Sequence, residues 1–84
     1  MTHYAASSFW HLHGALPKSV RTLAGKSFRL LVSNFSHPSL NFKPAGKYWS
    51  AHIGPGHRMI AVKSGHEYIW CWIGPVDAYE RMIQ

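Results

Sequence analysis

The sequence predicts an α+β domain in which two N-terminal helices pack on a small antiparallel sheet of three to four strands, with a short C-terminal helix after the sheet. Residues 17–33 place their apolar side chains on one helical stripe. Residues 46–79 instead alternate β-branched and aromatic runs with glycine-containing turns, which is typical of strands. The chain has 84 residues, the size of one small domain, so we treat residues 1–84 as a single unit.

Two helices are expected before the sheet. The first covers residues 9–15, after a serine at position 7 or 8 that can cap its N-terminus. The second begins at Pro17, because proline is favoured as a first helical residue, and ends near Ser33 with Asn34 as its C-cap. Its outward face is basic and carries Lys18, Arg21, Lys26 and Arg29. The segment before these helices, residues 1–7, is either a frayed end or a short edge strand.

Three strands follow, over residues 48–53, 57–63 and 67–73. The dipeptide Ser64-Gly65 is expected as a two-residue hairpin turn, and Gly74-Pro75 ends the last strand because proline cannot donate to a ladder. That last strand is apolar on both faces, so we expect it to be central and covered on both sides. Residues 40–43 alternate and can begin a fourth strand, and residues 76–83 are long enough for about two helical turns.

This turn would set Met59 opposite Trp70 and sort the last two strands into two faces. The aromatic face holds His57, Met59, Ala61, Tyr68, Trp70 and Trp72, and the aliphatic face holds Arg58, Ile60, Val62, Ile69, Cys71 and Ile73. We expect the aliphatic face to meet the helices, Arg58 to emerge near Gly74, and the aromatic face to be core rather than a platform for stacked bases. A one-residue β-bulge would exchange the faces.

The charge balance points to a polyanionic partner. Nine Lys and Arg residues against three Asp and Glu residues give a net charge of +6, which suits a nucleic acid or an acidic protein, although a basic surface with only non-specific affinity is also compatible. No run of about 18 apolar residues and no signal peptide pattern is present, so we expect no membrane partner and a cytoplasmic location. Cys71 is the only cysteine and is expected to be a buried, inert thiol.

Metal and cofactor chemistry is not expected. The sequence contains no HExxH motif and no phosphate-binding glycine loop, and Gly54-Pro55-Gly56 reads as a turn. His11 and His13 stand two positions apart and point to different sides of a helix, so they do not form a zinc pair. Three carboxylates give little support to paired-carboxylate or magnesium-dependent catalysis.

The remaining polar residues suit metal-free RNA cleavage. This reaction needs a base for the 2′-hydroxyl, cations for the charge that develops on phosphorus, and an acid for the 5′-oxygen. Histidine can be base or acid near neutral pH, arginine can clamp a phosphate, and a phenol or a lysine can complete the proton relay. A structural role is the alternative for each of them. The residues concerned are Lys43, Lys47, His52, His57, Arg58 and Tyr79.

Five segments together resemble the RelE/ParE superfamily of toxins, in particular its short HigB-like and plasmid-stabilisation branch. They read LPKSVRTLAGKSFRLL, HPSLNFK, YWSAHIG, HRMIAV and IWCWIGPVDAYERMI, and the resemblance covers about residues 9–83. It implies two helices on a small antiparallel sheet, and a toxin that a cognate antitoxin wraps and neutralises. It also implies cleavage of mRNA on the ribosome without a metal, because many members of this superfamily are such endonucleases.

The resemblance also implies roles for individual residues. Arg58 corresponds to the catalytic arginine on a strand and Tyr79 to the C-terminal tyrosine, and we add His52 as a group that moves protons. The residues expected to bind RNA are Lys43, Lys47, His57 and Arg21.

Three positions differ from the short relatives. His52 stands where arginine is usual, His57 where tyrosine is usual, and Val76 where a histidine is common. Two other functions therefore remain open, a gyrase-directed toxin of the same fold and a catalytically inactive relative that binds RNA or protein.

Overall fold

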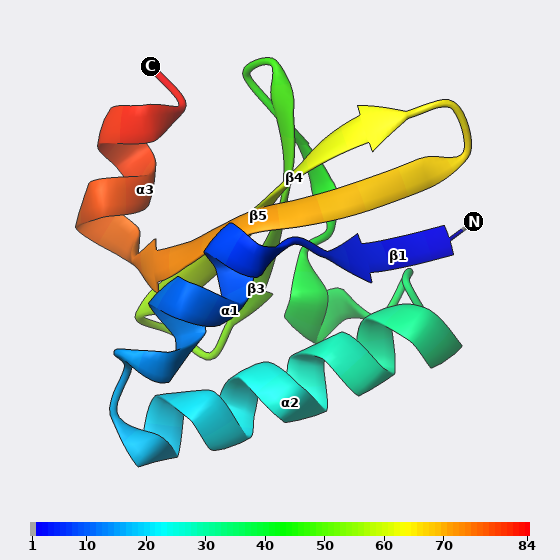
Figure 1. Cartoon of the computed structure of the whole chain (residues 1–84). Coiled ribbons are helices and arrows are strands. Elements are labelled where there is room, and N and C mark those ends of the chain that lie inside the picture. The colour runs from blue at the N-terminus through cyan, green and yellow to red at the C-terminus, as the bar shows by residue number, and fades with distance from the viewer. Residues whose placement is uncertain (1) are drawn as a thin grey trace.

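The computed structural model describes residues 2–84 as one five-stranded sheet with helices on both faces (Figure 1). The elements are β1 (Thr2–Ala5), α1 (Ser7–Gly14), α2 (Lys18–Ser33), a 3-10 helix (Pro38–Leu40), β2 (Lys43–Ala45), β3 (Tyr48–Ile53), β4 (His57–Ser64), β5 (Glu67–Pro75) and α3 (Val76–Met82). The strand order is β1-β5-β4-β3-β2. The predicted α+β class is confirmed, with one strand more than expected. Among residues 2–84, no helix has the length and apolar character needed to cross a membrane.

The N-terminal segment forms an edge strand, the second of the two expected alternatives. β1 pairs with β5 in parallel, whereas the other strand pairs are antiparallel. Its His3 ring stacks on Tyr68 with centroids 5.2 Å apart, and His3 Nδ1 accepts a hydrogen bond of 3.0 Å from Trp70 Nε1. These contacts fix a four-residue strand that is too short to be recognised from its own pattern.

The two predicted helices are present, and the predicted caps are confirmed for α2 but not for α1. α1 begins at Ser7 after Ala6 and has no side-chain cap, so the expected serine cap is wrong. Ser8 Oγ donates instead to the Cys71 carbonyl at 2.8 Å and ties α1 to β5. α2 begins directly after Pro17, and Asn34 forms its C-cap as predicted.

β2 begins later than expected. Residues 38–40 form the 3-10 helix, and Asn41 then adopts a left-handed conformation with φ 43° and ψ 47°. The strand starts at Lys43, and Gly46-Lys47 make the turn to β3, since Ala45 pairs with Tyr48. The further strand expected from residues 40–43 is therefore present, but it starts only at the last of them, because the backbone still turns at Asn41.

The register of β4 and β5 also differs from the prediction. Ser64 pairs with Glu67, so Gly65 and His66 form the turn, with Gly65 at φ +61° where glycine is favoured. A β-bulge lies between Ile60 and Ala61, and Cys71 on β5 has no partner across it. The observed pairs around the bulge are Met59 with Ile73, Ile60 with Trp72, and Ala61 with Trp70.

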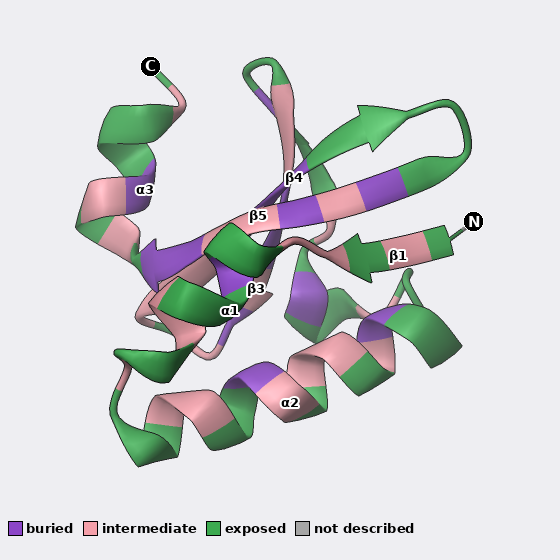
Figure 2. Ribbon diagram, viewed as in Figure 1, coloured by how far each residue is buried: buried purple, intermediate pink, exposed green. Residues whose placement is uncertain are grey.

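The two faces of the sheet carry separate cores, and Figure 2 shows buried residues on β5 and on the helices α2 and α3. The larger core joins α1 and α2 to the aromatic face and includes Phe9, Ala24, Leu31, Met59, Ala61, Tyr68, Trp70 and Ile73. The aromatic face is thus core as expected, but the prediction that the aliphatic face meets the helices was wrong. The smaller core joins α3 to the other face and is built on Ala45, Ile60 and Tyr79. The bulge explains one part of the difference, because it sends Trp72 to the α3 side and Ile73 to the α1–α2 side, whereas Ile60 keeps its predicted face and meets α3 there.

The α3 core contains one buried polar contact. Tyr79 Oη donates to Ser50 Oγ at 3.0 Å, and Ser50 is fully buried on β3. We expect Tyr79→Phe to lower the free energy of unfolding by about 1–3 kcal/mol, because it leaves the Ser50 hydroxyl buried without this partner. Urea denaturation of the variant measures this change.

The double variant Tyr79→Phe with Ser50→Ala is the control. It removes both polar groups, so it should lose less stability than the sum of the two single variants. Unchanged stability of Tyr79→Phe alone would contradict a stabilising role for the contact.

Candidate active site

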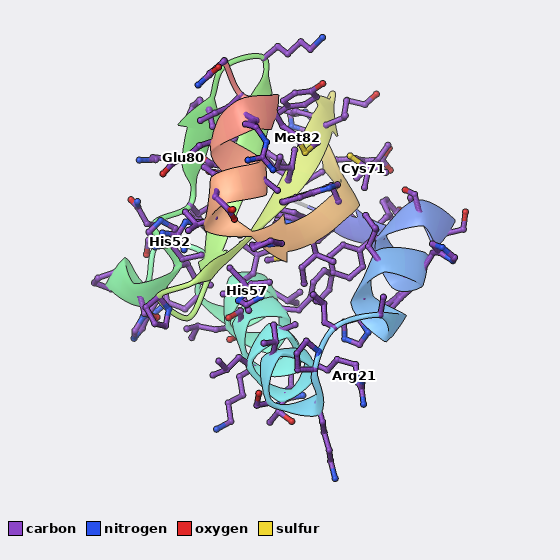
Figure 3. The ribbon with its side chains drawn as sticks, turned by 90° about the vertical axis from the view of Figure 1, so that its left-hand side faces the viewer. Arg21, His52, His57, Cys71, Glu80 and Met82 are labelled. Atoms are coloured by element: carbon purple, nitrogen blue, oxygen red, sulfur yellow. The ribbon has the colours of Figure 1, made fainter. Side chains whose placement is uncertain are left out.

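Three cationic or titratable side chains lie on adjacent strands of the α3 face. Arg58 on β4 pairs directly with His52 on β3, and Lys43 on β2 pairs with Ser50, two residues before His52. Residues directly opposite in an antiparallel pair share a face, and alternate residues along a strand do so as well. Ser50 is on the α3 side because it bonds Tyr79, so His52, Arg58 and Lys43 are on that side too. Figure 3 shows His52 at the β3 side of the molecule, beside the sheet that α3 crosses.

The surroundings of His52 favour its neutral form. Burial lowers the pKa of the imidazole most, and the positive charges of Arg58 and Lys43 lower it further. Asn41 adds a polar partner, since its Nδ2 lies 3.2 Å from His52 Nε2. An imidazole that stays neutral at physiological pH can accept a proton, which is the requirement for a general base.

Arg58 is held by the turn between β3 and β4. Its Nη1 donates to the His57 carbonyl at 2.7 Å and lies 3.4 Å from the carbonyl oxygens of Gly54 and Pro55. Within residues 2–84, Nε and Nη2 make no hydrogen bond. The guanidinium is therefore anchored through one nitrogen, and its other donors can bind an anion such as a phosphate.

Tyr79 lies on the same side of the sheet, but its hydroxyl is not open to solvent. The residue is 7% exposed, and its Oη is bonded to Ser50. Val76, on the first turn of α3, packs in the same small core. In this arrangement the tyrosine connects α3 to β3.

The other predicted RNA-binding residues are not gathered with this group. His57 alternates with Arg58 along β4 and is on the α1–α2 side, where Figure 3 shows it beside α2. Arg21 lies on α2, donates to the Leu16 carbonyl at 2.6 Å, and is far from His52 in Figure 3. Lys47 lies in the β2–β3 turn over the Tyr48 ring, five residues and so about 16 Å along the strand from His52.

Two polar residues of the site were not predicted. Asn41 reaches His52 because it ends the 3-10 helix in the left-handed region, which asparagine tolerates better than most residues. Ser50 is the partner of Tyr79. An asparagine that follows a Pro-Ser-Leu segment is a weak signal for the first residue, and the sequence offers none for the second.

Two other features of the molecule bear on the choice of site. Within the described part of the chain, no three His, Cys, Asp or Glu side chains are grouped to bind a metal ion. A groove of about 220 Å³ lies between α1 and α2, on the opposite side of the sheet. Its lining is Phe9, Trp10, His13, Ala24, Gly25, Phe28 and Arg29. The three-residue group on β2, β3 and β4 is therefore the candidate active site.

Comparison with known proteins gives one informative match. No protein-family model matches the chain, and neither does any curated protein. Among solved structures, the chain is similar to RelE in the crystal structure of the RelB-RelE antitoxin-toxin complex from Methanococcus jannaschii, with a TM-score of 0.71 and 13% sequence identity. The alignment covers 96% of this chain and 99% of that chain. Because so low an identity carries information on architecture alone, the conclusion concerns the fold: this protein has the fold of the RelE toxin.

Proposed function

We propose that this protein is the toxin of a type II toxin–antitoxin system and that it acts as a metal-independent, ribosome-dependent mRNA endonuclease in the cytoplasm. The observation that carries the proposal is the position of His52 between two cations, Arg58 and Lys43, on one face of a RelE-like sheet. This group supplies a neutral base and two positive charges, which metal-free cleavage of RNA requires.

In the proposed reaction, His52 accepts the proton of the 2′-hydroxyl, whose oxygen then attacks the neighbouring phosphorus. The bond from phosphorus to the 5′-oxygen breaks and leaves a 2′,3′-cyclic phosphate. Arg58 binds the non-bridging oxygens while negative charge develops on them, through the nitrogens that the turn carbonyls leave free. Lys43 donates the proton to the departing 5′-oxygen, because the Tyr79 hydroxyl is buried and bonded to Ser50. Tyr79 acts in this scheme by holding α3 on the sheet.

The more distant of the residues predicted to bind RNA have a different proposed role. Arg21, Lys47 and His57 lie on three separate parts of the chain, so they can contact phosphates of the mRNA or of the ribosome beyond the scissile bond. The protein partner is proposed to be an acidic segment of a cognate antitoxin, since a net charge of +6 on 84 residues favours such a segment.

We expect Arg58→Ala to abolish growth inhibition on induced expression. The variant loses the group that stabilises the developing charge, which slows cleavage by about 10²-fold or more. Mapping mRNA 5′ ends after induction measures cleavage, and thermal unfolding checks that the variant folds. Arg58→Lys keeps the charge without the planar fork and should be intermediate. Arg29→Ala, an exposed arginine on α2, is the matched control and should cleave as the wild type does.

The same experiment separates the other two functions. New in-frame cuts that disappear with Arg58→Ala support the endonuclease. Growth arrest without cuts would instead indicate the gyrase-directed toxin, and a chain that causes no arrest would be the inactive relative, with Val76 in place of the common histidine. A folded Arg58→Ala variant that cuts mRNA normally would remove Arg58 from the mechanism.

A second prediction concerns the electrostatics of His52. We expect Lys43→Met to raise the pKa of the imidazole, because one of the two positive charges that disfavour imidazolium is lost. In the wild type, the pKa of His52 in the folded state lies below the ordinary value of 6.5 that applies to the unfolded state. Between these two pKa values, the folded protein therefore gains stability as pH rises and loses it as pH falls. An NMR titration of the His52 ring checks the direction of the shift. Lys18→Met, on α2, should leave it unchanged, and equal shifts in both variants would contradict a local effect.

A further inference from the structure

The contact between Asn41 and His52 is within hydrogen-bond distance, and the backbone of Asn41 sets the direction of its side chain. Asn41 Nδ2 lies 3.2 Å from His52 Nε2. Asn41 ends the 3-10 helix, where its backbone N–H donates to the Pro38 carbonyl, and its left-handed conformation (φ 43°) is one that asparagine tolerates. The side chain therefore leaves the turn in a defined direction, toward β3.

We infer that Asn41 is a positioning residue that selects the tautomer of His52: its amide N–H donates to Nε2 and keeps the imidazole proton on Nδ1. The amide nitrogen is only a donor, so the imidazole nitrogen that it contacts must offer a lone pair. An imidazolium has no lone pair, and the Nε2–H tautomer has none at Nε2. The observed contact is thus compatible with one of the three forms of the ring, the neutral Nδ1–H tautomer.

The surrounding charges support this inference without deciding the tautomer. The groups that act on His52 are Arg58 from β4 and Lys43 from β2, both positive, and together with burial they favour the neutral ring. Within the described residues, neither cation makes a hydrogen bond to a ring nitrogen, whereas Asn41 does. Within residues 2–84, Nδ1 makes no hydrogen bond. Asn41 is therefore the group that determines which nitrogen is unprotonated.

The consequence for catalysis rests on the proposed function. In the Nδ1–H tautomer, the lone pair of Nε2 accepts a hydrogen bond from the Asn41 amide. When RNA binds, the 2′-hydroxyl of the substrate can replace this amide as the donor to Nε2. After proton transfer, rotation of the amide would present Oδ1 to the new Nε2–H. A histidine ring without a hydrogen-bond partner prefers its proton on Nε2. A proton there would leave Nε2 without the lone pair that must accept the proton of the 2′-hydroxyl. Asn41 thus prepares His52 before RNA arrives.

The test uses two substitutions that suit the left-handed backbone of residue 41. Asn41→Gly keeps the conformation and removes the amide. Asn41→Asp keeps the shape but supplies only acceptors, so it draws a proton onto Nε2 and raises the pKa of His52. Nitrogen-15 NMR of the imidazole rings in the full chain reports the tautomer directly, and the His52→Gln variant identifies the signals of His52.

In the wild type, above the titration of His52, we expect a protonated Nδ1 and an unprotonated Nε2. The proton should move toward Nε2 in Asn41→Gly and fully onto Nε2 in Asn41→Asp. Asn34→Gly, at the C-cap of α2, is the matched control and should leave the tautomer unchanged. A wild-type ring with its proton on Nε2, or a tautomer that does not respond to Asn41→Gly, would overturn the inference.

Cleavage of mRNA gives the second readout. We expect Asn41→Gly to lower cleavage by up to about tenfold, the worth of one neutral hydrogen bond. Asn41→Asp should lower it by about 10²-fold, because it removes the base. A residue that served only to fill space would show the opposite order, since aspartate has the shape of asparagine. Cleavage by Asn41→Asp at or above that of Asn41→Gly would overturn the positioning role.

These measurements also separate this inference from the proposed function. The tautomer is measured without RNA, so a wild type that fails to cleave but shows the expected tautomers would refute the endonuclease and leave the Asn41 inference standing. A wild type that cleaves while its tautomer ignores Asn41 would refute the inference and leave the endonuclease standing.

Discussion

The alternation of side chains along β4 is the constraint on which both the core and the candidate site depend. β4 is the middle strand, and its three consecutive residues Met59, Ile60 and Ala61 are fully buried. Two of them face α1 and α2, whereas Ile60 faces α3, so the strand must be covered on both sides. The same alternation decides the position of Arg58. It follows Ile60 to the α3 side and meets His52 there, at the end of the strand where coverage stops.

The candidate site opposes the stability of the domain that carries it. Lys43 and Arg58 both lie near enough to His52 to lower the pKa of its imidazole, so their repulsion of a protonated His52 disfavours the folded state. The core beneath α3 is small, with Ala45, Ile60 and Tyr79 as its buried residues. A bound polyanion would relieve the repulsion, so ligand binding and folding stability are coupled at this face. The larger core on the other side of the sheet supplies the stability that the site lacks.

The sequence predicted the elements that local chemistry determines. The stripe of α2 between Pro17 and Asn34, the extent of β3 and the helix after Pro75 all follow from periodicity and from proline and asparagine at their usual positions. β1 was left open because a four-residue polar strand is stabilised by its neighbour rather than by its own pattern. The predicted register of β4 and β5 was wrong because Ser64-Gly65 and Gly65-His66 are both acceptable turns, and only packing decides between them.

The candidate site was also predicted only in part. The position of Arg58 beside Gly74 follows from the end of the hairpin and was expected. The separation of His57 from His52 depends on which residues of β3 and β4 face α3. The approach of Asn41 to His52 depends on how the 3-10 helix leads into β2. Such relations join segments that are distant in sequence, so one chain read by periodicity does not contain them.

The β-bulge at Ile60 and Ala61 has a consequence for how this chain can change over time. Because Cys71 is the residue without a partner, the indole of Trp70 and that of Trp72 face opposite layers, although they stand two positions apart on one strand. Deletion of a paired residue of β5, such as Ile69, would shift the side chains on one side of the deletion by one position and send them into the wrong layer. Within the two strands, substitutions can be absorbed singly, but a change in length cannot. Insertions and deletions should therefore accumulate in homologues at the exposed turn around Gly65 and be excluded from the strands on either side of it.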